Sequence, residues 1–200
     1  FVLSLISIPV WVTYARSFVE KAARTGILAR ILPKDDLEPA VPQRFSNHVV
    51  ICGHGRVGRE VRSLLDLANI SYVVVDFNRK VIGDLLSAGK YAICGDPTDR
   101  EILEATFIRD ARVLVIAVPD GFSQKQIVNE ALKLNPNIVI VCRSHVEDDR
   151  YELINMGVNT IVVPEFEAGL RIGHEVLDLF SISTQDVDGF IKRLRRTSLL

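Results

Sequence analysis

The sequence predicts an α/β fold built on a doubly wound parallel sheet of six strands. Three observations predict it: short apolar runs alternate with amphipathic segments, the turn Gly-His-Gly-Arg-Val-Gly at residues 53–58 follows the first run, and Asp76 ends the second. Short, uninterrupted apolar runs are typical of parallel strands that are buried on both faces. The order strand, glycine turn, helix, strand, acid is that of a Rossmann-like dinucleotide-binding βαβ unit.

Each part of the glycine turn has a mechanical role in such a unit. Gly53 permits the tight turn, Gly55 lets backbone N–H groups approach a pyrophosphate, and Gly58 lets the helix pack closely on the strand. The helix N-terminus offers unpaired N–H groups and a partial positive charge to phosphates. Asp76 stands about 20 residues further on, where an acid that binds a ribose is expected. The alternatives are a turn that only packs a helix on a sheet and, for Asp76, a turn or capping residue.

The remaining elements follow from hydrophobic periodicity and from turn signals. The first helix should bury one face, formed by Val57, Val61, Leu64, Leu65 and Ala68. The expected strands are His48–Cys52, Tyr72–Val75, Tyr91–Cys94, Val113–Val118, Ile138–Cys142 and Thr160–Val163. The later helices are expected at Val81–Ala88, Arg100–Thr106 (capped by Thr98 or Asp99), Gly121–Leu134, Asp148–Met156 and Phe166–Phe180.

In a sheet of this kind, a ligand binds at the carboxyl ends of the strands. Arg56 in the glycine loop and Arg143 after the fifth strand could each hold a phosphate, although Arg143 could pair with Glu165 and both could be solvated surface charges. Asp96 could equally belong to an ordinary turn, and the His54 side chain should point outward. The candidate ligand-binding residues are Gly53, His54, Gly55, Arg56, Val57, Gly58, Asp76, Phe77, Asp96, Pro97, Ala117, Val118, Arg143 and Glu165.

Composition narrows the function classes. The chain has 200 residues, of which 48% are hydrophobic, so that one core can be buried. The net charge of −1, from 24 basic and 25 acidic residues, gives no support for a nucleic-acid partner. Cys52, Cys94 and Cys142 lie far apart and lack metal-ligand spacing, so we expect buried, reduced thiols in a cytosolic environment. His145 and His174 are expected to be structural or surface residues, and no metal site is expected.

The first 46 residues have a different character. Residues 1–13 are almost wholly apolar but shorter than the roughly 20 residues that cross a bilayer. Aromatic and then basic residues follow this run, as at the cytoplasmic border of a membrane. We interpret residues 1–31 as the end of a last transmembrane helix and a juxtamembrane helix, with an ordinary soluble helix as the alternative. Residues 32–46 contain three prolines and should form a linker. A nucleotide-binding domain is expected at residues 47–180 and a helical tail at residues 181–200.

Several motifs together resemble an RCK N-terminal domain, also called a TrkA-N domain. They are the glycine turn, Asp76, the Gly-Asp-Pro-Thr-Asp segment at residues 95–99 and the Cys-Arg-Ser-His segment at residues 142–145. The resemblance implies homodimers that bind NAD(H) or an adenine nucleotide (AMP, ADP or ATP) and thereby gate transport. The leading segment and residues 167–180 resemble the monovalent cation:proton antiporter-2 group. Pro97 departs from the alanine that is commoner in the family and removes an N–H group.

We therefore expect the cytoplasmic regulatory domain of a membrane-bound K⁺ or Na⁺/proton antiporter, partnered by the transporter's own membrane domain. A potassium-channel domain is the alternative within this class. An NAD-dependent oxidoreductase is the alternative of another class. It is less favoured because the sequence shows no consistent catalytic set and too few residues for a second, substrate-binding domain. A third hypothesis is a structural module that has lost its ligand. The intact glycines and Asp76 argue against this hypothesis.

Overall fold

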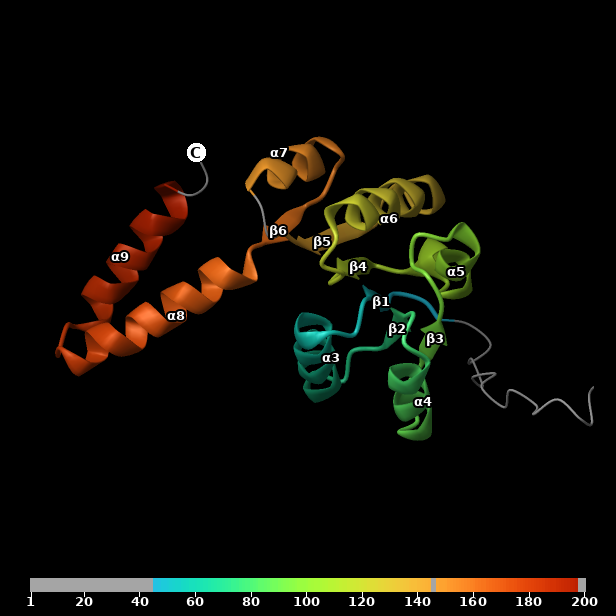
Figure 1. The fold of residues 1–200 in the computed structure, drawn as a ribbon, viewed down its shortest axis with the longest axis horizontal. Helices are drawn as coiled ribbons and strands as arrows, with labels where there is room; N and C mark the ends of the chain where they lie inside the picture. Colours follow the sequence, from blue (N-terminus) through green and yellow to red (C-terminus); the bar gives the residue numbers. More distant parts are fainter. Residues whose placement is uncertain (1–44, 145–146, 198–200) are drawn as a thin grey trace, which may run out of the picture. The chain divides into compact units, whose positions relative to one another are not determined.

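Six parallel strands form one sheet in the computed structural model, which describes residues 45–144 and 147–197 (Figure 1). Their order, β3-β2-β1-β4-β5-β6, is that of a doubly wound sheet and confirms the predicted fold. The central strand pairs Val50 with Val73 on one side and with Leu114 on the other. The strands are β1 (Val49–Cys52), β2 (Tyr72–Asp76), β3 (Ala92–Cys94), β4 (Val113–Ile116), β5 (Val139–Arg143) and β6 (Thr160–Val162).

Helices connect the strands and cover both faces of the sheet. Helices α3 and α4 lie on one side of it, and α5 and α6 lie on the other (Figure 1). A short 3₁₀ helix, η1, between α5 and β4 was not expected from the sequence. The helices are α3 (Arg56–Leu67), α4 (Arg79–Ser87), α5 (Arg100–Ala105), η1 (Ile108–Asp110), α6 (Gly121–Leu134), α7 (Glu147–Asn155), α8 (Pro164–Leu179) and α9 (Thr184–Thr197).

The core consists of two apolar clusters, one on each face of the sheet. On one face Val50 packs with Ile127 and with other residues of α5 and α6, and on the other face Ile51 packs with Ile82 of α4. All four side chains are at most 1% exposed. Because successive residues of β1 serve opposite clusters, this strand is completely buried, and it gives the glycine loop that follows it a rigid base.

Helix α3 does not bury the whole face that its sequence predicts. Leu64 is 66% exposed and Ala68 is also exposed, so the expectation was wrong for these two residues. Gly58 is the fully buried residue of this helix. Its close packing on the loop turns the line of Gly58, Arg62 and Leu65 toward the sheet and carries Leu64 and Ala68 away from it.

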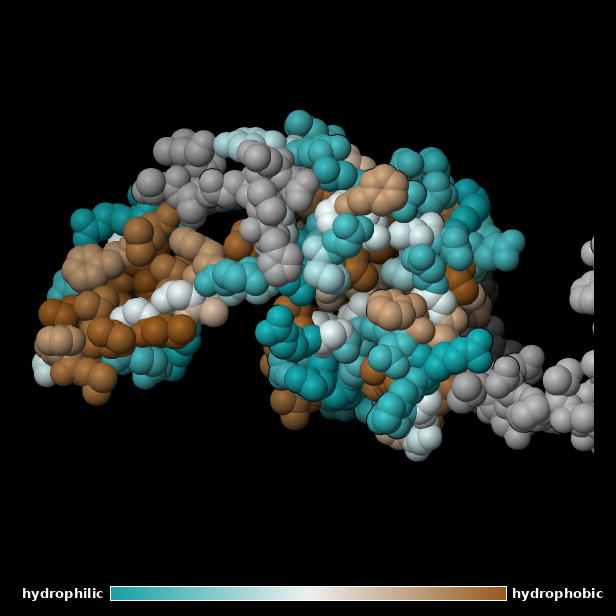
Figure 2. All heavy atoms as spheres, in the orientation of Figure 1, coloured by the Kyte–Doolittle hydropathy of each residue, from teal (hydrophilic) through white to brown (hydrophobic). Residues whose placement is uncertain are grey.

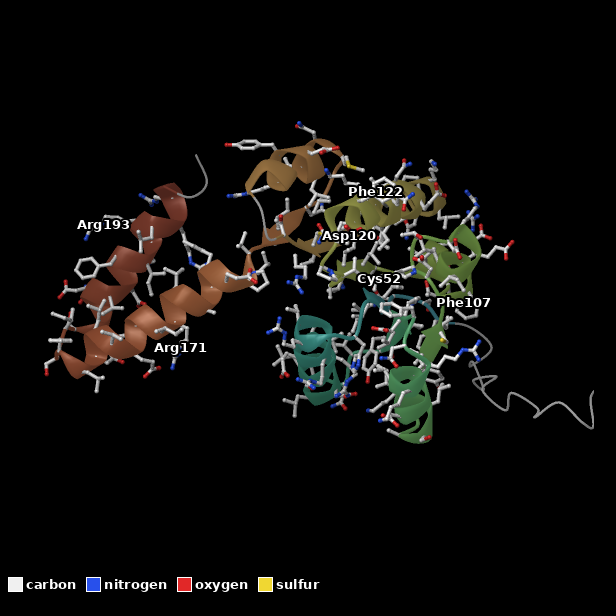
Figure 3. The ribbon with its side chains drawn as sticks, viewed as in Figure 1. Cys52, Phe107, Asp120, Phe122, Arg171 and Arg193 are labelled. Atoms are coloured by element: carbon white, nitrogen blue, oxygen red, sulfur yellow. The ribbon has the colours of Figure 1, made fainter. Side chains whose placement is uncertain are left out.

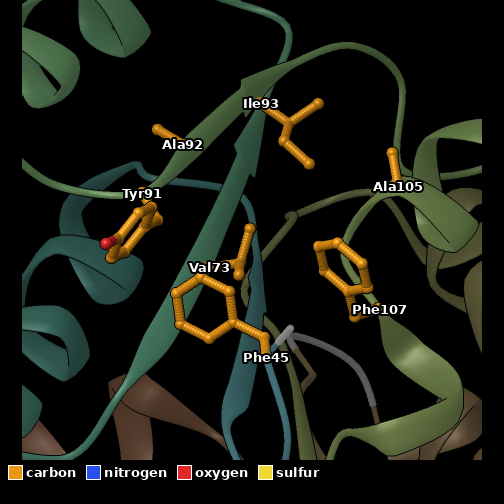
Figure 4. A pocket seen from close by; sticks show the side chains of 7 residues that line it. All are labelled: Phe45, Val73, Tyr91, Ala92, Ile93, Ala105 and Phe107. Carbon is orange, nitrogen blue, oxygen red and sulfur yellow. The ribbon is translucent and has the colours of Figure 1, made fainter. Parts of the chain in front are cut away.

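Phe45, which falls in the predicted linker of residues 32–46, is buried and helps to line a small pocket, the aromatic socket, at the β2–β3 edge of the sheet (Figure 4). Its ring meets the Tyr91 ring edge to face at a centroid distance of 4.6 Å and lies 6.4 Å from that of Phe107. Phe107 adopts a left-handed backbone conformation with φ of 57°. The socket is lined by Phe45, Val73, Tyr91, Ala92, Ile93, Ala105 and Phe107. Phe45 therefore belongs to the packed domain. The expectations for residues 1–44 lie outside the described residues.

The C-terminal helices contact each other. Arg195 of α9 donates two hydrogen bonds to the Glu167 carboxylate of α8, at 2.8 and 2.7 Å. Many apolar side chains of this pair remain exposed, and Figure 2 shows apolar atoms gathered over both helices. They include Ile172, Val176, Leu179, Phe180, Phe190 and Leu194. Of the helices in the described ranges, none is long and apolar enough to cross a membrane.

Candidate functional site

A cleft of about 410 Å³ opens at the carboxyl ends of β1, β2, β4 and β5. This is where a doubly wound sheet binds its ligands, and the volume suits a small molecule. Ten of the fourteen residues that the sequence proposes line it: Gly53, His54, Gly55, Arg56, Asp76, Phe77, Pro97, Ala117, Val118 and Arg143. The lining also includes Pro119, which follows the fourth strand, and Val75, Asn78 and Val81, which the sequence did not single out as ligand contacts. All four lie within a few residues of the proposed ones, at strand ends or the helix start that follows.

The three glycines of the loop have different surroundings. Gly53 has a φ of +95°, and a Cβ there would lie 3.1 Å from the Val118 nitrogen. A Cβ on Gly58 would lie 1.9 Å from the Gly53 oxygen, so no side chain fits between the helix and the loop. A Cβ on Gly55 would meet no atom within 4 Å. Gly53 and Gly58 are thus required by the fold, whereas Gly55 keeps open the space in front of the α3 N-terminus.

The N-terminus of α3 favours an anion. Gly55 is its N-cap residue and supplies no side-chain cap, and the first turn contains no acidic residue. The first N–H groups of α3 have no acceptor within the helix, and no carboxylate of that turn accepts from them. No such carboxylate offsets the positive end of the helix dipole either. Arg56 and Arg143 line the same cleft and add positive charge. A phosphate group suits these donors.

Asp76 lies at the end of β2 and is only 9% exposed. Its Oδ2 accepts a hydrogen bond from the His54 backbone N–H at 2.6 Å, and its Oδ1 accepts one from the Asn78 N–H at 2.8 Å. A carboxylate has about four acceptor positions, so two remain for further donors such as hydroxyl groups. The cap of α4 is supplied by Asn78, whose side chain accepts from the N–H groups of Lys80 and Val81. Asp76 therefore ties the glycine loop to β2.

The His54 side chain does not point outward as expected. The ring is half-buried, and its Nε2 accepts a hydrogen bond from Arg62 Nε at 3.1 Å. Burial lowers the pKa of His54, the charge of Arg62 lowers it further, and Asp76 partly opposes the shift. Arg62 is not among the residues proposed from the sequence, because no motif marks it and a charged residue on a helix is ordinarily solvated. Its burial follows from the packing of Gly58, four residues earlier on the same side of α3.

The other proposed residues lie outside the lining of the cleft. Gly58 and Val57 belong to the first turn of α3, and Glu165 belongs to α8. Asp96 closes a turn by accepting from the Thr98 N–H and hydroxyl at 2.9 and 2.7 Å. Asp99 occupies the N-cap position of α5, but its side chain makes no capping hydrogen bond, contrary to expectation.

The cysteines differ from one another. Cys52 and Cys142 are buried as expected, and burial raises the pKa of Cys142 to about 12. Cys94 is exposed, so the expectation was wrong for it. It ends the edge strand β3, which has a neighbouring strand on one side only, and its Sγ lies 3.7 Å from the Phe77 carbonyl oxygen. Within residues 45–144 and 147–197, no group of histidine, cysteine and acidic side chains is arranged to hold a metal.

The sheet order, the glycine loop and the acid at the end of β2 define a Rossmann-like domain. Comparison of the sequence with known families assigns the chain to one family within this class. Residues 49–164 match the TrkA-N domain family, and the chain belongs to that family.

Two curated relatives and one solved structure illustrate the similarity. The putative cation/proton antiporter YbaL of Escherichia coli is 30% identical over 65% of this chain and 23% of its own length. Potassium channel protein 1 of Methanocaldococcus jannaschii is 32% identical over 65% of this chain and 40% of its own length. The Kef CTD of Shewanella denitrificans, in its AMP-bound form, is 26% identical, with a TM-score of 0.67 over 76% of this chain and 92% of that one. The chain thus spans less than half the length of these curated relatives.

Proposed function

We propose that this chain is the cytoplasmic, nucleotide-binding regulatory domain of a membrane-bound antiporter that exchanges K⁺ or Na⁺ for protons. One observation carries the proposal: the open space at Gly55, before the N-terminus of α3, and the Asp76 carboxylate face the same cleft. Phosphates suit the helix N-terminus, and ribose hydroxyls suit the carboxylate. The AMP-bound state of the Kef CTD supports an adenine nucleotide. NAD(H), AMP, ADP and ATP are the candidate ligands, and binding would gate transport.

A potassium channel is the alternative within the same class, favoured by the channel relative from Methanocaldococcus jannaschii. The same cleft would serve either protein, because the difference lies in the membrane domain that the regulatory domain controls. The similarity to YbaL, a putative cation/proton antiporter, favours the antiporter. An oxidoreductase has less support, because these relatives are named as transport proteins.

We propose in addition that the domain acts as a homodimer attached to its own transporter. Two exposed apolar surfaces support the presence of a partner that covers a large area of the domain. One is formed by the exposed side chains of α8 and α9, such as Leu179 and Phe180. The other is the sheet face at β5 and β6, where Val139 is 42% and Val162 37% exposed, although strands of a parallel sheet are ordinarily covered on both faces. A two-fold assembly would bury such surfaces on both subunits.

Isothermal titration calorimetry with NAD⁺, NADP⁺, AMP and ADP tests the nucleotide site. The negative charge of Asp76 should repel a 2′-phosphate, so we expect NAD⁺ or an adenine nucleotide to bind clearly better than NADP⁺. Asp76→Ala should lose about 1–3 kcal/mol of binding free energy, the scale of a charge-assisted hydrogen bond. Asp96→Ala, outside the cleft lining, is the control. Equal or tighter binding of NADP⁺, or no binding of any of the four, would contradict the proposal.

A further inference from the structure

Arg62 lies in the middle of α3, and its side chain is only 20% exposed. Its guanidinium group donates to three neighbours: Nε to His54 Nε2 at 3.1 Å, Nη1 to the Asp66 carboxylate, and Nη2 to the Ser63 hydroxyl at 3.3 Å. One of these partners belongs to the glycine loop, and the other two belong to the helix. The side chain therefore connects the loop of the cleft to the body of α3.

Asp66, the partner of Arg62 on α3, is itself held in place by other segments of the chain. Asp66 also accepts hydrogen bonds from the Lys90 Nζ at 2.6 Å and from the Tyr72 hydroxyl at 2.8 Å. Tyr72 begins β2, and Lys90 stands just before β3, so that three segments of the chain hold one carboxylate. Because Asp66 is held in this way, the Arg62 guanidinium has a defined position from which to reach His54.

His54 is held from two sides. Its backbone N–H donates to Asp76 of β2, and its ring accepts from Arg62 of α3. The loop between Gly53 and Gly55 is thereby fixed both to the sheet and to the helix. This loop also carries the open space at Gly55, and the hydrogen bond from the His54 backbone N–H orients the Asp76 carboxylate. The proposed nucleotide site depends on both features.

We propose that Arg62 is a positioning residue for the nucleotide site, and that it acts by donating a hydrogen bond to neutral His54 and so holding the glycine loop in its ligand-ready conformation. This inference rests on the proposed function. Arg62 itself does not line the cleft, so the proposed role is indirect and acts through His54.

The arrangement makes nucleotide binding sensitive to acid. Nε2 of His54 accepts a hydrogen bond only while it is unprotonated. A proton on that atom would face the Arg62 guanidinium instead of the cleft, beside the further positive charge of Arg59, with Asp76 of β2 as the opposing negative group. Burial and these arginines lower the pKa of His54 from its ordinary value. Because this pKa lies below its ordinary value, the hydrogen bond should be intact at pH 7.5 and break only in acid, once the ring takes up a proton.

The test is calorimetry with NAD⁺ as the probe on the 200-residue chain, at pH 7.5 and pH 5. NAD⁺ is chosen because its pyrophosphate is fully esterified, whereas the terminal phosphate of AMP titrates near pH 6, as phosphate monoesters do. At pH 7.5, Arg62→Met should bind NAD⁺ about tenfold more weakly than wild type, since a hydrogen bond from a charged donor is lost. Arg59→Met, which removes the same charge one turn earlier from an exposed side chain, should bind within about twofold of wild type.

Variants of His54 test the acid sensitivity. Wild-type affinity should fall at least threefold between pH 7.5 and pH 5. His54→Gln keeps an acceptor for Arg62 but cannot titrate, so its affinity, whatever its value at pH 7.5, should change little between pH 7.5 and pH 5. His54→Ala should bind weakly at both pH values. His174→Gln, which removes an imidazole from α8, should retain the wild-type pH profile.

A measurement without nucleotide checks the contact itself. Titration of the His54 ring by NMR should give a pKa below its ordinary value in wild type, and Arg62→Met should raise it, because both the donor and the positive charge are removed. Thermal unfolding of each variant shows whether it is folded. The His54 variants leave the hydrogen bonds of Asp66 with Arg62, Tyr72 and Lys90 intact. They therefore still test the proposal if Arg62→Met does not fold.

The outcomes separate the two proposals. If wild type does not bind NAD⁺ or an adenine nucleotide at all, the proposed function fails and the positioning role fails with it. If wild type binds NAD⁺ but Arg62→Met and Arg59→Met weaken it equally, the positioning role alone is overturned. Affinity that stays flat or rises in acid would also overturn it, because His54 would then be indifferent to protonation or would be a phosphate ligand.

Discussion

Gly55 and Gly58 stand three residues apart, yet the structure tolerates a side chain at one and not at the other. Gly55 has ordinary extended backbone angles, with φ of −72°, and open space where a Cβ would lie. A Cβ on Gly58 would collide with the Gly53 carbonyl oxygen. The same motif therefore contains one glycine that the fold requires and another that we propose serves the ligand, and substitution should separate the two roles.

We expect Gly55→Asp to abolish nucleotide binding and leave the domain folded. Its carboxylate would extend into the cleft, where it would repel phosphates and compete for the N–H groups of α3. The measurement is calorimetry with the best-binding nucleotide, alongside thermal unfolding. Gly83→Asp on α4, where a Cβ also meets open space, adds the same charge and should bind normally. Retained binding by Gly55→Asp would mean that the nucleotide does not approach this loop.

Gly58→Ala should have the opposite profile and act on stability. A methyl group 1.9 Å from the Gly53 oxygen cannot be accommodated unless α3 moves away from β1. Overpacking of this kind costs about 3 kcal/mol of unfolding free energy, near the upper end of its usual range. Urea denaturation measures the change, and Gly83→Ala is the matched control. Unchanged stability would show that α3 shifts freely relative to the loop.

Asp66 should make stability depend on pH. Burial works to raise the pKa of Asp66, but the hydrogen bonds from Lys90 and Tyr72 and the nearby positive charges outweigh it, so the pKa is lowered. A carboxylate with a lowered pKa adds stability above its unfolded value, about 3.9, and that stability is lost as the pH falls through the folded value.

Asp66→Asn should therefore lower the unfolding free energy by about 2 kcal/mol at pH 7 and by less at pH 3. Urea denaturation at both pH values provides the measurement. Asp84→Asn is the control, because its partner Lys80 and its own side chain are at least 70% exposed and such pairs contribute little. A deficit that is equal at both pH values would show that the effect is not electrostatic.

Among the elements, the aromatic socket attaches the start of the domain to the sheet edge. Phe45 is 6% exposed, and its ring lies near those of His48, Tyr91 and Phe107, the last of which stands in the segment after α5 (Figure 3, Figure 4). Phe45→Ala should lower the unfolding free energy by about 3 kcal/mol, the scale of a buried phenylalanine. Phe122→Ala, at a residue that is 70% exposed, should change it by less than about 0.5 kcal/mol. Equal stability of both variants would show that the socket does not contribute to folding.

At this scale the sequence predicts the order and type of the elements better than their details. The apolar runs and the glycine turn give all six strands, and the limits of Gly121–Leu134 agree with α6. Strand ends differ by a residue or two because apolar residues such as Ala117 continue past the last ladder pair. The burial of α3 was misjudged because periodicity does not show which line of side chains the Gly58 contact turns inward.

For the whole molecule, the cleft could be predicted because parallel topology brings the carboxyl ends of distant strands together. That rule places Asp76 and Arg143 on one cleft, although 67 positions separate them in the sequence. The connection from His54 through Arg62 could not be predicted, since it depends on rotamers and on burial that no motif encodes. The exposed apolar surface at β5 and β6 was likewise visible only once the packing was known.

Transport by the full-length protein tests whether the cleft regulates. A nucleotide can shift a transporter between conformations only if it binds one of them more tightly, and this coupling is reciprocal. In liposomes that contain the whole protein, saturating nucleotide should therefore change the cation/proton flux of wild type and of Gly83→Asp. It should leave the flux of Gly55→Asp unchanged, because that variant cannot take up the ligand. If nucleotide binding is confirmed and the wild-type flux is the same with and without it, the cleft binds nucleotide without regulating transport.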